Sequence, residues 1–221
     1  MPDSLRLGVL LSGSGSNLQA LLDAIETGRL QARVAVVISN VADAKGLDRA
    51  RRHGISAVVI EHRSAPSREA YDAEVVSALQ AHDVGLVVLA GFMRLVTPVL
   101  LNAYPNRVLN IHPALLPAFP GLHAARQALA HGARLTGVTV HFVDEETDHG
   151  PILAQAAVPI APDDTEMTLH ARIQRQEHRI YPFAIQLIAE GRVRVEGRSV
   201  VIAGWSANAD DALASPAPSP A

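Results

Sequence analysis

Residues 5–17 read LRLGVLLSGSGSN, and this stretch decides the first unit of the fold. The apolar run Leu5 to Leu11 is typical of a buried strand, and it leads into a turn of serines and glycines. Apolar residues then recur at helical spacing from Leu18 to a stop at Gly28. Glycines let a backbone approach a ligand, and the free N–H groups at a helix start favour an anion. The stretch therefore predicts either a phosphate site or a tight turn without a ligand. Leu18 replaces the third glycine of the dinucleotide fingerprint, which disfavours a nicotinamide cofactor.

The alternation of strands and helices continues as far as residue 111. Further strands are predicted at 34–38, 58–60, 86–90 and 108–111, and further helices at 43–53 and 67–81. Strands that alternate with helices form parallel sheets covered on both faces, and such strands are apolar almost throughout. We therefore predict the α/β class, with a mostly parallel, twisted, Rossmann-like sheet and helices on both faces.

The pattern changes after His112, where three prolines within residues 113–120 predict an irregular loop. The remaining predicted elements are a helix at 122–131, strands at 137–142 and 152–158, a helix at 165–190 and a hairpin of strands 192–195 and 199–202. The late strands are expected to be antiparallel. Pro182 is expected to kink or divide the long helix.

Composition narrows the function classes. The 221 residues carry 19 Lys and Arg against 22 Asp and Glu, a net charge of −3, which argues against a basic nucleic-acid binder. Cysteine is absent, which excludes disulfides, thiolate metal sites and cysteine nucleophiles. No signal peptide or membrane-spanning run is present, so we expect a cytoplasmic protein with no membrane or nucleic-acid partner and no metal. Residues 1–206 are expected to form one domain, and the Ala-, Pro- and Ser-rich residues 207–221 a disordered tail.

The strongest candidate for chemistry is the pair Asn110 and His112 at the end of the last parallel strand. Residues two apart on a strand project from the same face. An amide and an imidazole at the carboxyl edge of a sheet can surround a developing oxyanion. The plainer interpretation is a histidine that only hydrogen-bonds the following loop.

Two other polar groups lie downstream. The loop of residues 144–151 holds four acids, any one of which could face His112 and favour its imidazolium form, although an acidic run is more often a solvated loop. In the long helix, Gln174 and Glu177 share one face, opposite an apolar stripe, where polar residues are usually only solvated.

Together these residues resemble the folate-dependent formyltransferases, over about residues 7–202. Six segments carry the resemblance: SGSGSN (12–17); SREAYD (67–72); LAGFMR (89–94); LNIHP (109–113) with LLP (115–117) and PGLH (120–123); HFV (141–143) leading to Asp148; and QEH (176–178) with IYP (180–182). Each segment is weak alone, but their joint order is specific. One position departs from the family pattern, because His149 stands where members usually have glycine or another small residue.

The resemblance assigns roles to residues. It implies a catalytic set of Asn110, His112 and Asp148. It implies substrate contacts at the phosphate from Gly15, Ser16 and Asn17, and at the glycinamide from Gln174 and Glu177. It implies folate contacts from Arg68, Met93, Arg94, Leu95, Val96, Asn110 and the loop that runs from Val143 to Asp148.

The implied reaction moves the formyl group of 10-formyltetrahydrofolate to the amine of 5'-phosphoribosylglycinamide, in de novo purine biosynthesis. Folate is then a co-substrate, no cofactor is tightly bound, and the protein is a monomer or a homodimer. Formyltetrahydrofolate hydrolases and methionyl-tRNA formyltransferases share the catalytic set. The first add an N-terminal domain, for which a strand at Leu5 leaves no room, and the second add a C-terminal domain and a basic surface. An inert phosphate-binding α/β module is the alternative without catalysis.

Overall fold

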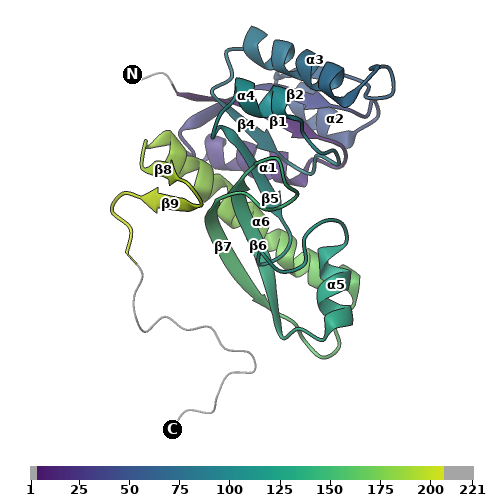
Figure 1. Ribbon diagram of the computed structural model, residues 1–221, viewed down its shortest axis with the longest axis vertical. Coiled ribbons are helices and arrows are strands. Elements are labelled where there is room, and N and C mark those ends of the chain that lie inside the picture. The colour runs from purple at the N-terminus through teal and green to yellow at the C-terminus, as the bar shows by residue number, and fades with distance from the viewer. Residues whose placement is uncertain (1–3, 207–221) are drawn as a thin grey trace.

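The computed structural model describes residues 4–206, so the predicted tail 207–221 lies outside the described residues. A seven-stranded sheet has the order β3-β2-β1-β4-β5-β6-β7, and a separate hairpin pairs β8 with β9 (Figure 1). The strands are β1 (Leu5–Leu11), β2 (Ala32–Ser39), β3 (Ser56–Val59), β4 (Leu86–Leu89), β5 (Val108–His112), β6 (Leu135–Phe142), β7 (Ile152–Pro159), β8 (Val193–Glu196) and β9 (Ser199–Ile202). The helices are α1 (Ser16–Glu26), α2 (Lys45–Arg52), α3 (Arg68–Ala81), α4 (Pro98–Ala103), α5 (Ala124–His131) and α6 (Glu166–Ala189).

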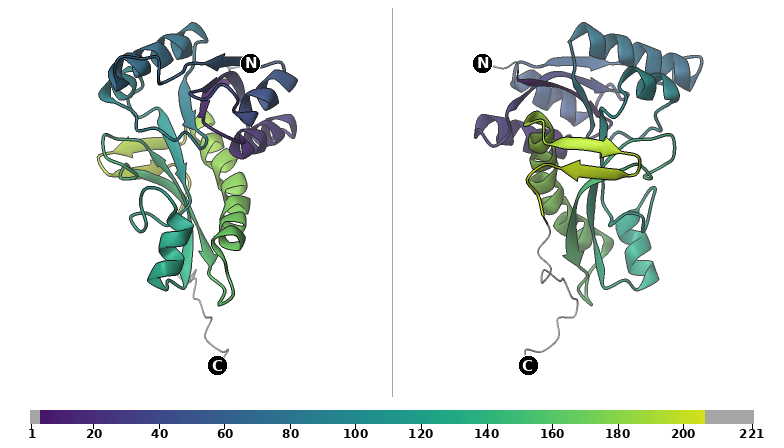
Figure 2. Two further views of the ribbon diagram at one scale, coloured as in Figure 1. Left: turned by 90° about the vertical axis from the view of Figure 1, so that its right-hand side faces the viewer. Right: turned by 60° about the vertical axis from the view of Figure 1, so that its left-hand side comes forward.

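The predicted α/β architecture is confirmed. Strands β1 to β5 pair in parallel, while β6 and β7 pair antiparallel. All four residues of β4 are buried, as expected of a central strand covered on both faces. One apolar cluster packs α1, α2 and α6 against the sheet, and a second packs α3 and α4 against the opposite face (Figure 2). None of the described helices combines the length and apolarity needed to cross a membrane.

The long helix is not divided at Pro182, one of the two outcomes predicted there, because α6 runs unbroken through this residue. Proline removes one backbone donor and crowds the preceding turn, but packing around it holds the helix together. The preceding residue, Tyr181, is fully buried, and its hydroxyl lies 2.9 Å from the carbonyl oxygen of Leu89 and 3.0 Å from that of Leu109. Ala184 and Ile185 in the following turn are also fully buried.

A second difference is α4, a short helix in a stretch to which we assigned no element. Its start has ordinary helix signals, since Thr97 accepts a hydrogen bond from the Val99 N–H and Pro98 occupies the first turn. The helix matters because it follows the loop of residues 91–96. The buried carboxylate of Asp72 accepts hydrogen bonds from the backbone N–H and the hydroxyl of Thr97, at 2.6 and 2.7 Å, and so fixes the end of that loop.

The topology brings distant segments to one edge of the sheet. The chain leaves β1 toward β2 on one side and later returns to β4 on the other, so the turn after β1 lies at a topological switch point. Open α/β sheets bind ligands at this place, beyond the carboxyl ends of the strands. Strand β5 ends at the same edge, and its antiparallel neighbour β6 places His141 opposite Asn110.

Candidate active site

A cleft of about 970 Å³ opens beyond the carboxyl ends of β4 and β5. One wall is the loop of residues 91–96, and another is the loop of residues 143–148 that joins β6 to β7. Leu122, Glu166 and Met167 lie on a further part of the wall. The lining includes Asn110, His112 and Asp148, so the structure brings the three expected catalytic side chains together from two separate segments.

His112 is held by both of its ring nitrogens. The ring is almost completely buried, with Nδ1 lying 3.2 Å from Oδ2 of Asp148 and Nε2 lying 2.8 Å from the carbonyl oxygen of Phe119. Both neighbours are hydrogen-bond acceptors, so the doubly protonated imidazolium can donate to both at once. The site is therefore arranged for a cationic histidine beside an ionised aspartate.

Asp148 is the acid of its loop that contacts His112. Sequence spacing alone did not distinguish it from the three other acids of the loop. Its backbone is left-handed, with a φ of 53°. Oδ1 accepts a hydrogen bond from the Asn110 amide at 3.4 Å, and Oδ2 accepts one from the Gly121 N–H at 2.8 Å. Burial alone would raise the pKa of the carboxyl, but the nearby His141 ring, the hydrogen bond from the Gly121 N–H and the charges of the two histidines together lower this pKa below its usual value.

His141 is the residue of this cluster that we did not single out from the sequence. Its buried ring places Nε2 3.2 Å from the Asn110 amide nitrogen and 3.7 Å from Oδ1 of Asp148. Its Nδ1 lies 3.0 Å from the Phe142 carbonyl oxygen, which fixes the ring orientation. The signal that could have found it is the antiparallel register, because His141 pairs directly with Asn110.

The turn after β1 forms a second polar cluster with α6. Gly15 has a φ of 70°, and a Cβ added there would lie 2.6 Å from the Gly46 Cα, so only glycine fits without displacement. The Ser16 hydroxyl accepts a hydrogen bond from the Gln174 amide at 3.1 Å, and the Asn17 amide donates to Glu177 at 2.9 Å. The five residues expected to bind the nucleotide thus lie together, outside the lining of the large cleft.

Ser12 connects this turn to the cleft. Its backbone N–H donates to the Gly91 carbonyl oxygen at 3.0 Å, and its hydroxyl accepts a hydrogen bond from the Met93 N–H at 2.8 Å. The hydroxyl also donates to the side-chain oxygen of Asn40 at 2.6 Å. The turn and the 91–96 loop are therefore fixed relative to each other.

Most residues expected to contact folate line the cleft. They are Met93, Arg94, Leu95, Val96, Asn110 and Val143. Arg68 lies outside the lining and donates a hydrogen bond to the Leu95 carbonyl oxygen at 3.3 Å, so in this structure it supports the loop. The Arg94 guanidinium lies 4.5 Å from the centre of the Tyr71 ring, in a cation–π contact.

Comparisons with known proteins agree with this arrangement. Residues 5–185 match the Formyl transferase family. Phosphoribosylglycinamide formyltransferase of Escherichia coli is 46% identical over 196 residues, which are 89% of this chain and 92% of that protein. The crystal structure of glycinamide ribonucleotide transformylase 1 from Symbiobacterium toebii is 57% identical, with a TM-score of 0.90 over 91% of this chain and 95% of that one.

A formyltetrahydrofolate deformylase from Pseudomonas syringae shares the fold at greater distance. It is 28% identical, with a TM-score of 0.82 over 91% of this chain but only 66% of that one. The matches to the transferases are thus higher in identity and cover more of the matched protein. On the family match, the relatives and the shared fold, this chain belongs to the formyl transferase family.

Proposed function

We propose that the chain transfers the formyl group of 10-formyltetrahydrofolate to the amine of 5'-phosphoribosylglycinamide and releases formylglycinamide ribonucleotide and tetrahydrofolate. The Escherichia coli relative is a phosphoribosylglycinamide formyltransferase, and a relative from Drosophila pseudoobscura pseudoobscura is a trifunctional purine biosynthetic protein. The observation that carries the proposal is the contact of His112 with Asp148, next to Asn110, at the inner end of a cleft large enough for a folate. The polar cluster of α1 and α6 receives the ribonucleotide on the adjoining side.

The chemistry needs no activated serine or cysteine, because the substrate amine is already a nucleophile. The amine nitrogen forms a bond to the formyl carbon, and the carbonyl electron pair moves onto oxygen. Cationic His112 and the Asn110 amide donate hydrogen bonds to that oxyanion. The pair then returns as the bond to N10 of the folate breaks. The amine loses one proton and N10 gains one, with His112 as the carrier.

Ionised Asp148 stabilises the imidazolium, which gives a proton to N10 as the bond to the formyl carbon breaks and recovers one from the amine. The lowered pKa of Asp148 keeps it charged at neutral pH. In the structure the Phe119 carbonyl oxygen accepts a hydrogen bond from Nε2 of His112 at 2.8 Å. An incoming formyl oxygen has to replace this acceptor, so we propose that substrate binding moves the segment around Phe119 away from the ring.

The nucleotide site is proposed at the start of α1. Gly15 and Ser16 present backbone N–H groups that lie before the first complete helical turn and favour a phosphate. Glu177 is almost completely buried and ionisable, and it lies with Gln174 beside this turn. A carboxylate and an amide at this position can hold the hydroxyl, ammonium and amide groups of a ribosylglycinamide.

A formyl-transfer assay with three acceptors tests the proposal: phosphoribosylglycinamide, charged initiator tRNA and water. Transfer to the ribonucleotide is expected to dominate, and His112→Ala is expected to reduce it by about 100- to 1000-fold, since one oxyanion donor is lost. Release of formate alone would favour a formyltetrahydrofolate hydrolase, and transfer to tRNA would favour a methionyl-tRNA formyltransferase. No turnover with any acceptor in the folded protein would favour the inert module.

Three sequence-based expectations stay predictions. They are the absence of a tightly bound cofactor, the monomeric or homodimeric state and the cytoplasmic location. Because each substrate can diffuse in and out, dialysed protein is expected to be fully active when both substrates are added.

A further inference from the structure

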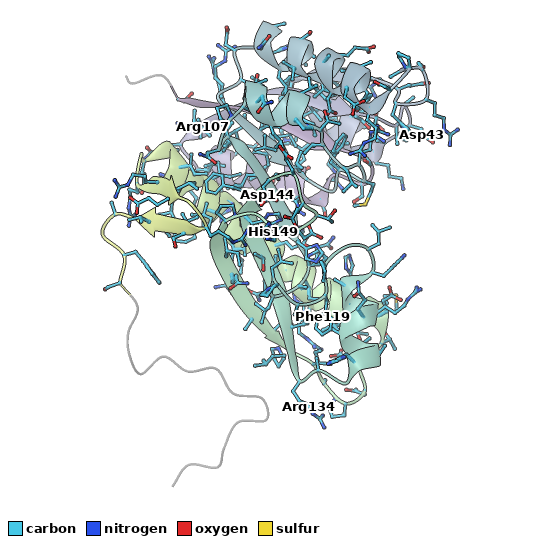
Figure 3. All side chains as sticks on the ribbon, viewed as in Figure 1. Asp43, Arg107, Phe119, Arg134, Asp144 and His149 are labelled. Carbon is cyan, nitrogen blue, oxygen red and sulfur yellow. The ribbon has the colours of Figure 1, made fainter. Side chains whose placement is uncertain are left out.

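The β8–β9 hairpin contacts the loop that carries Asp148, through a residue outside the cleft. Arg198 lies in the hairpin turn, and its Nη2 donates a hydrogen bond to the His149 carbonyl oxygen at 2.6 Å. Its Nη1 lies 3.0 and 3.1 Å from the two ring nitrogens of His149, and 3.8 Å from Oδ2 of Asp144. Figure 3 labels Asp144 and His149 next to the hairpin. The candidate active site described above includes no part of this hairpin.

The hairpin is a firm support for such a contact. Val193, Val195, Val200 and Ile202 alternate along the two strands and pack against the core. Arg192 closes the base of the hairpin, with its Nε donating to the Ala203 carbonyl oxygen at 2.9 Å. The guanidinium of Arg198 therefore projects from a segment that is tied to the body of the protein.

The other side of the contact is restrained at its two ends. The Phe142 N–H donates to the Pro151 carbonyl oxygen at 2.9 Å, which closes the base of the loop. At Gly150 a Cβ would lie 1.8 Å from the Phe142 carbonyl oxygen, so the chain is tightly packed there. Between these anchors, Nδ1 of His149 lies 2.8 Å from Oδ2 of Asp144, which links the loop to itself.

Arg198 holds residue 149 in two ways. Besides the hydrogen bond to its carbonyl, Nη1 is almost equally distant from both ring nitrogens, so it cannot point at the lone pair of either one and instead lies against the ring as a whole. Arginine is suited to this double contact, because its planar group can donate and stack together.

We infer that Arg198 is a positioning residue for Asp148, and this inference rests on the catalytic role proposed for that carboxylate. The carbonyl that Arg198 holds belongs to His149, the residue after Asp148. The backbone of Asp148 is left-handed, a conformation that is unfavourable for residues other than glycine. Fixing this carbonyl keeps the Asp148 side chain directed at His112. The contacts of Arg198 are with His149 and Asp144, away from the five residues proposed to bind the nucleotide, so its effect falls on turnover and not on nucleotide binding.

The test compares Arg198→Ala, Arg198→Lys and the matched control Arg194→Ala. Arg194 lies on the same hairpin but pairs with Glu196 at 2.6 Å, away from the loop. Because the Arg198 side chain is 61% exposed, we expect Arg198→Ala to lower kcat only about 3- to 10-fold, with the KM for phosphoribosylglycinamide unchanged. Arg198→Lys is expected to recover part of the loss, since an ammonium can still donate to the carbonyl. Arg194→Ala is expected to match the wild type.

Amide hydrogen exchange gives a second readout that does not depend on catalysis. Arg198→Ala is expected to speed exchange in residues 144–150, while Arg194→Ala leaves it unchanged. Wild-type kcat and exchange in Arg198→Ala would overturn the inference. Equal loss of kcat and melting temperature in both alanine variants would also overturn it, because the hairpin would then act only through stability. Failure of the proposed function is separate, since it appears as wild-type protein without formyl transfer to the ribonucleotide.

Discussion

The two halves of the proposed site are built in opposite ways. The turn after β1 is joined to α6 by hydrogen bonds, and at Gly15 it packs so closely against Gly46 of α2 that no side chain would fit. The cleft is open and apolar, and Met93 and Leu95 on its wall are 65% and 57% exposed. Preorganisation therefore matters more for one substrate than for the other. Polar recognition of a small charged substrate needs fixed partners, whereas a large flat ring can bind to apolar walls that adjust around it.

The largest expected effect lies between the two halves, where the chemistry occurs. Asp148→Asn is expected to lower kcat by about 100- to 1000-fold, because His112 loses its charged partner, with modest changes in both KM values. Asp144→Asn removes the same charge from the same loop and is expected to have a far smaller effect. Steady-state kinetics of the two variants check this. A larger loss in Asp144→Asn would show that the roles of the loop acids are assigned wrongly.

A smaller effect is expected from a substitution in the preformed half of the site, which is the turn after β1 with the α6 residues bonded to it. Glu177→Gln keeps the shape of the side chain but removes its charge beside Asn17. We expect the KM for phosphoribosylglycinamide to rise about 10-fold and the KM for the formyl donor to stay the same. Initial rates with each substrate varied in turn measure the split. A rise in both KM values would mean that the two halves are not independent.

The open half should respond more weakly to truncation. Leu95→Ala is expected to raise the KM for the formyl donor about fivefold, through the apolar area lost on binding, without altering the KM for the ribonucleotide. Because Leu95 is mostly exposed in the free protein, the melting temperature of the variant should equal that of the wild type. Differential scanning calorimetry beside the kinetics separates the two contributions. A lower melting temperature would place Leu95 in the structural core instead.

The smallest effect is expected on the stability of the fold at acid pH, from a pair of charged residues near the start of α6. The Arg172 guanidinium donates hydrogen bonds to both oxygens of Asp164 and lowers its pKa from 3.8 to about 2. A pKa that is lower in the folded state stabilises the fold above pH 3.8, and this contribution disappears as the pH falls toward 2. Asp164→Asn should therefore lower the melting temperature at neutral pH more than at pH 2. An equal decrease at both pH values would contradict this.

Sequence patterns were sufficient to predict the part of the molecule in which strands and helices alternate. Apart from α4, the strands and helices up to residue 111 lie close to the ranges predicted from apolar patterns, and the glycines of residues 13–15 indicate the turn at the switch point. Asn110 and His112 share a face because a strand has a period of two. Local rules are enough in these places because each signal lies within one element.

The other parts depended on tertiary structure. Asp148 followed from the family resemblance alone, because four nearby acids have equivalent spacing. His141 became evident only when the antiparallel register set it opposite Asn110. Of the two outcomes predicted at Pro182, a kink or a division, the division did not occur, because burial of the flanking turns outweighs one missing hydrogen bond.

The phenol of Tyr181 has a wider consequence. It contacts a carbonyl oxygen of each of the paired strands β4 and β5, and it comes from the same helix as Gln174 and Glu177. The helix α6 therefore carries the residues proposed to bind the nucleotide and also contacts the strands that lead to the loop of residues 91–96 and to His112. On the proposed function, the spacing between the two substrates depends on where this helix lies, so it should survive large changes in the surface loops.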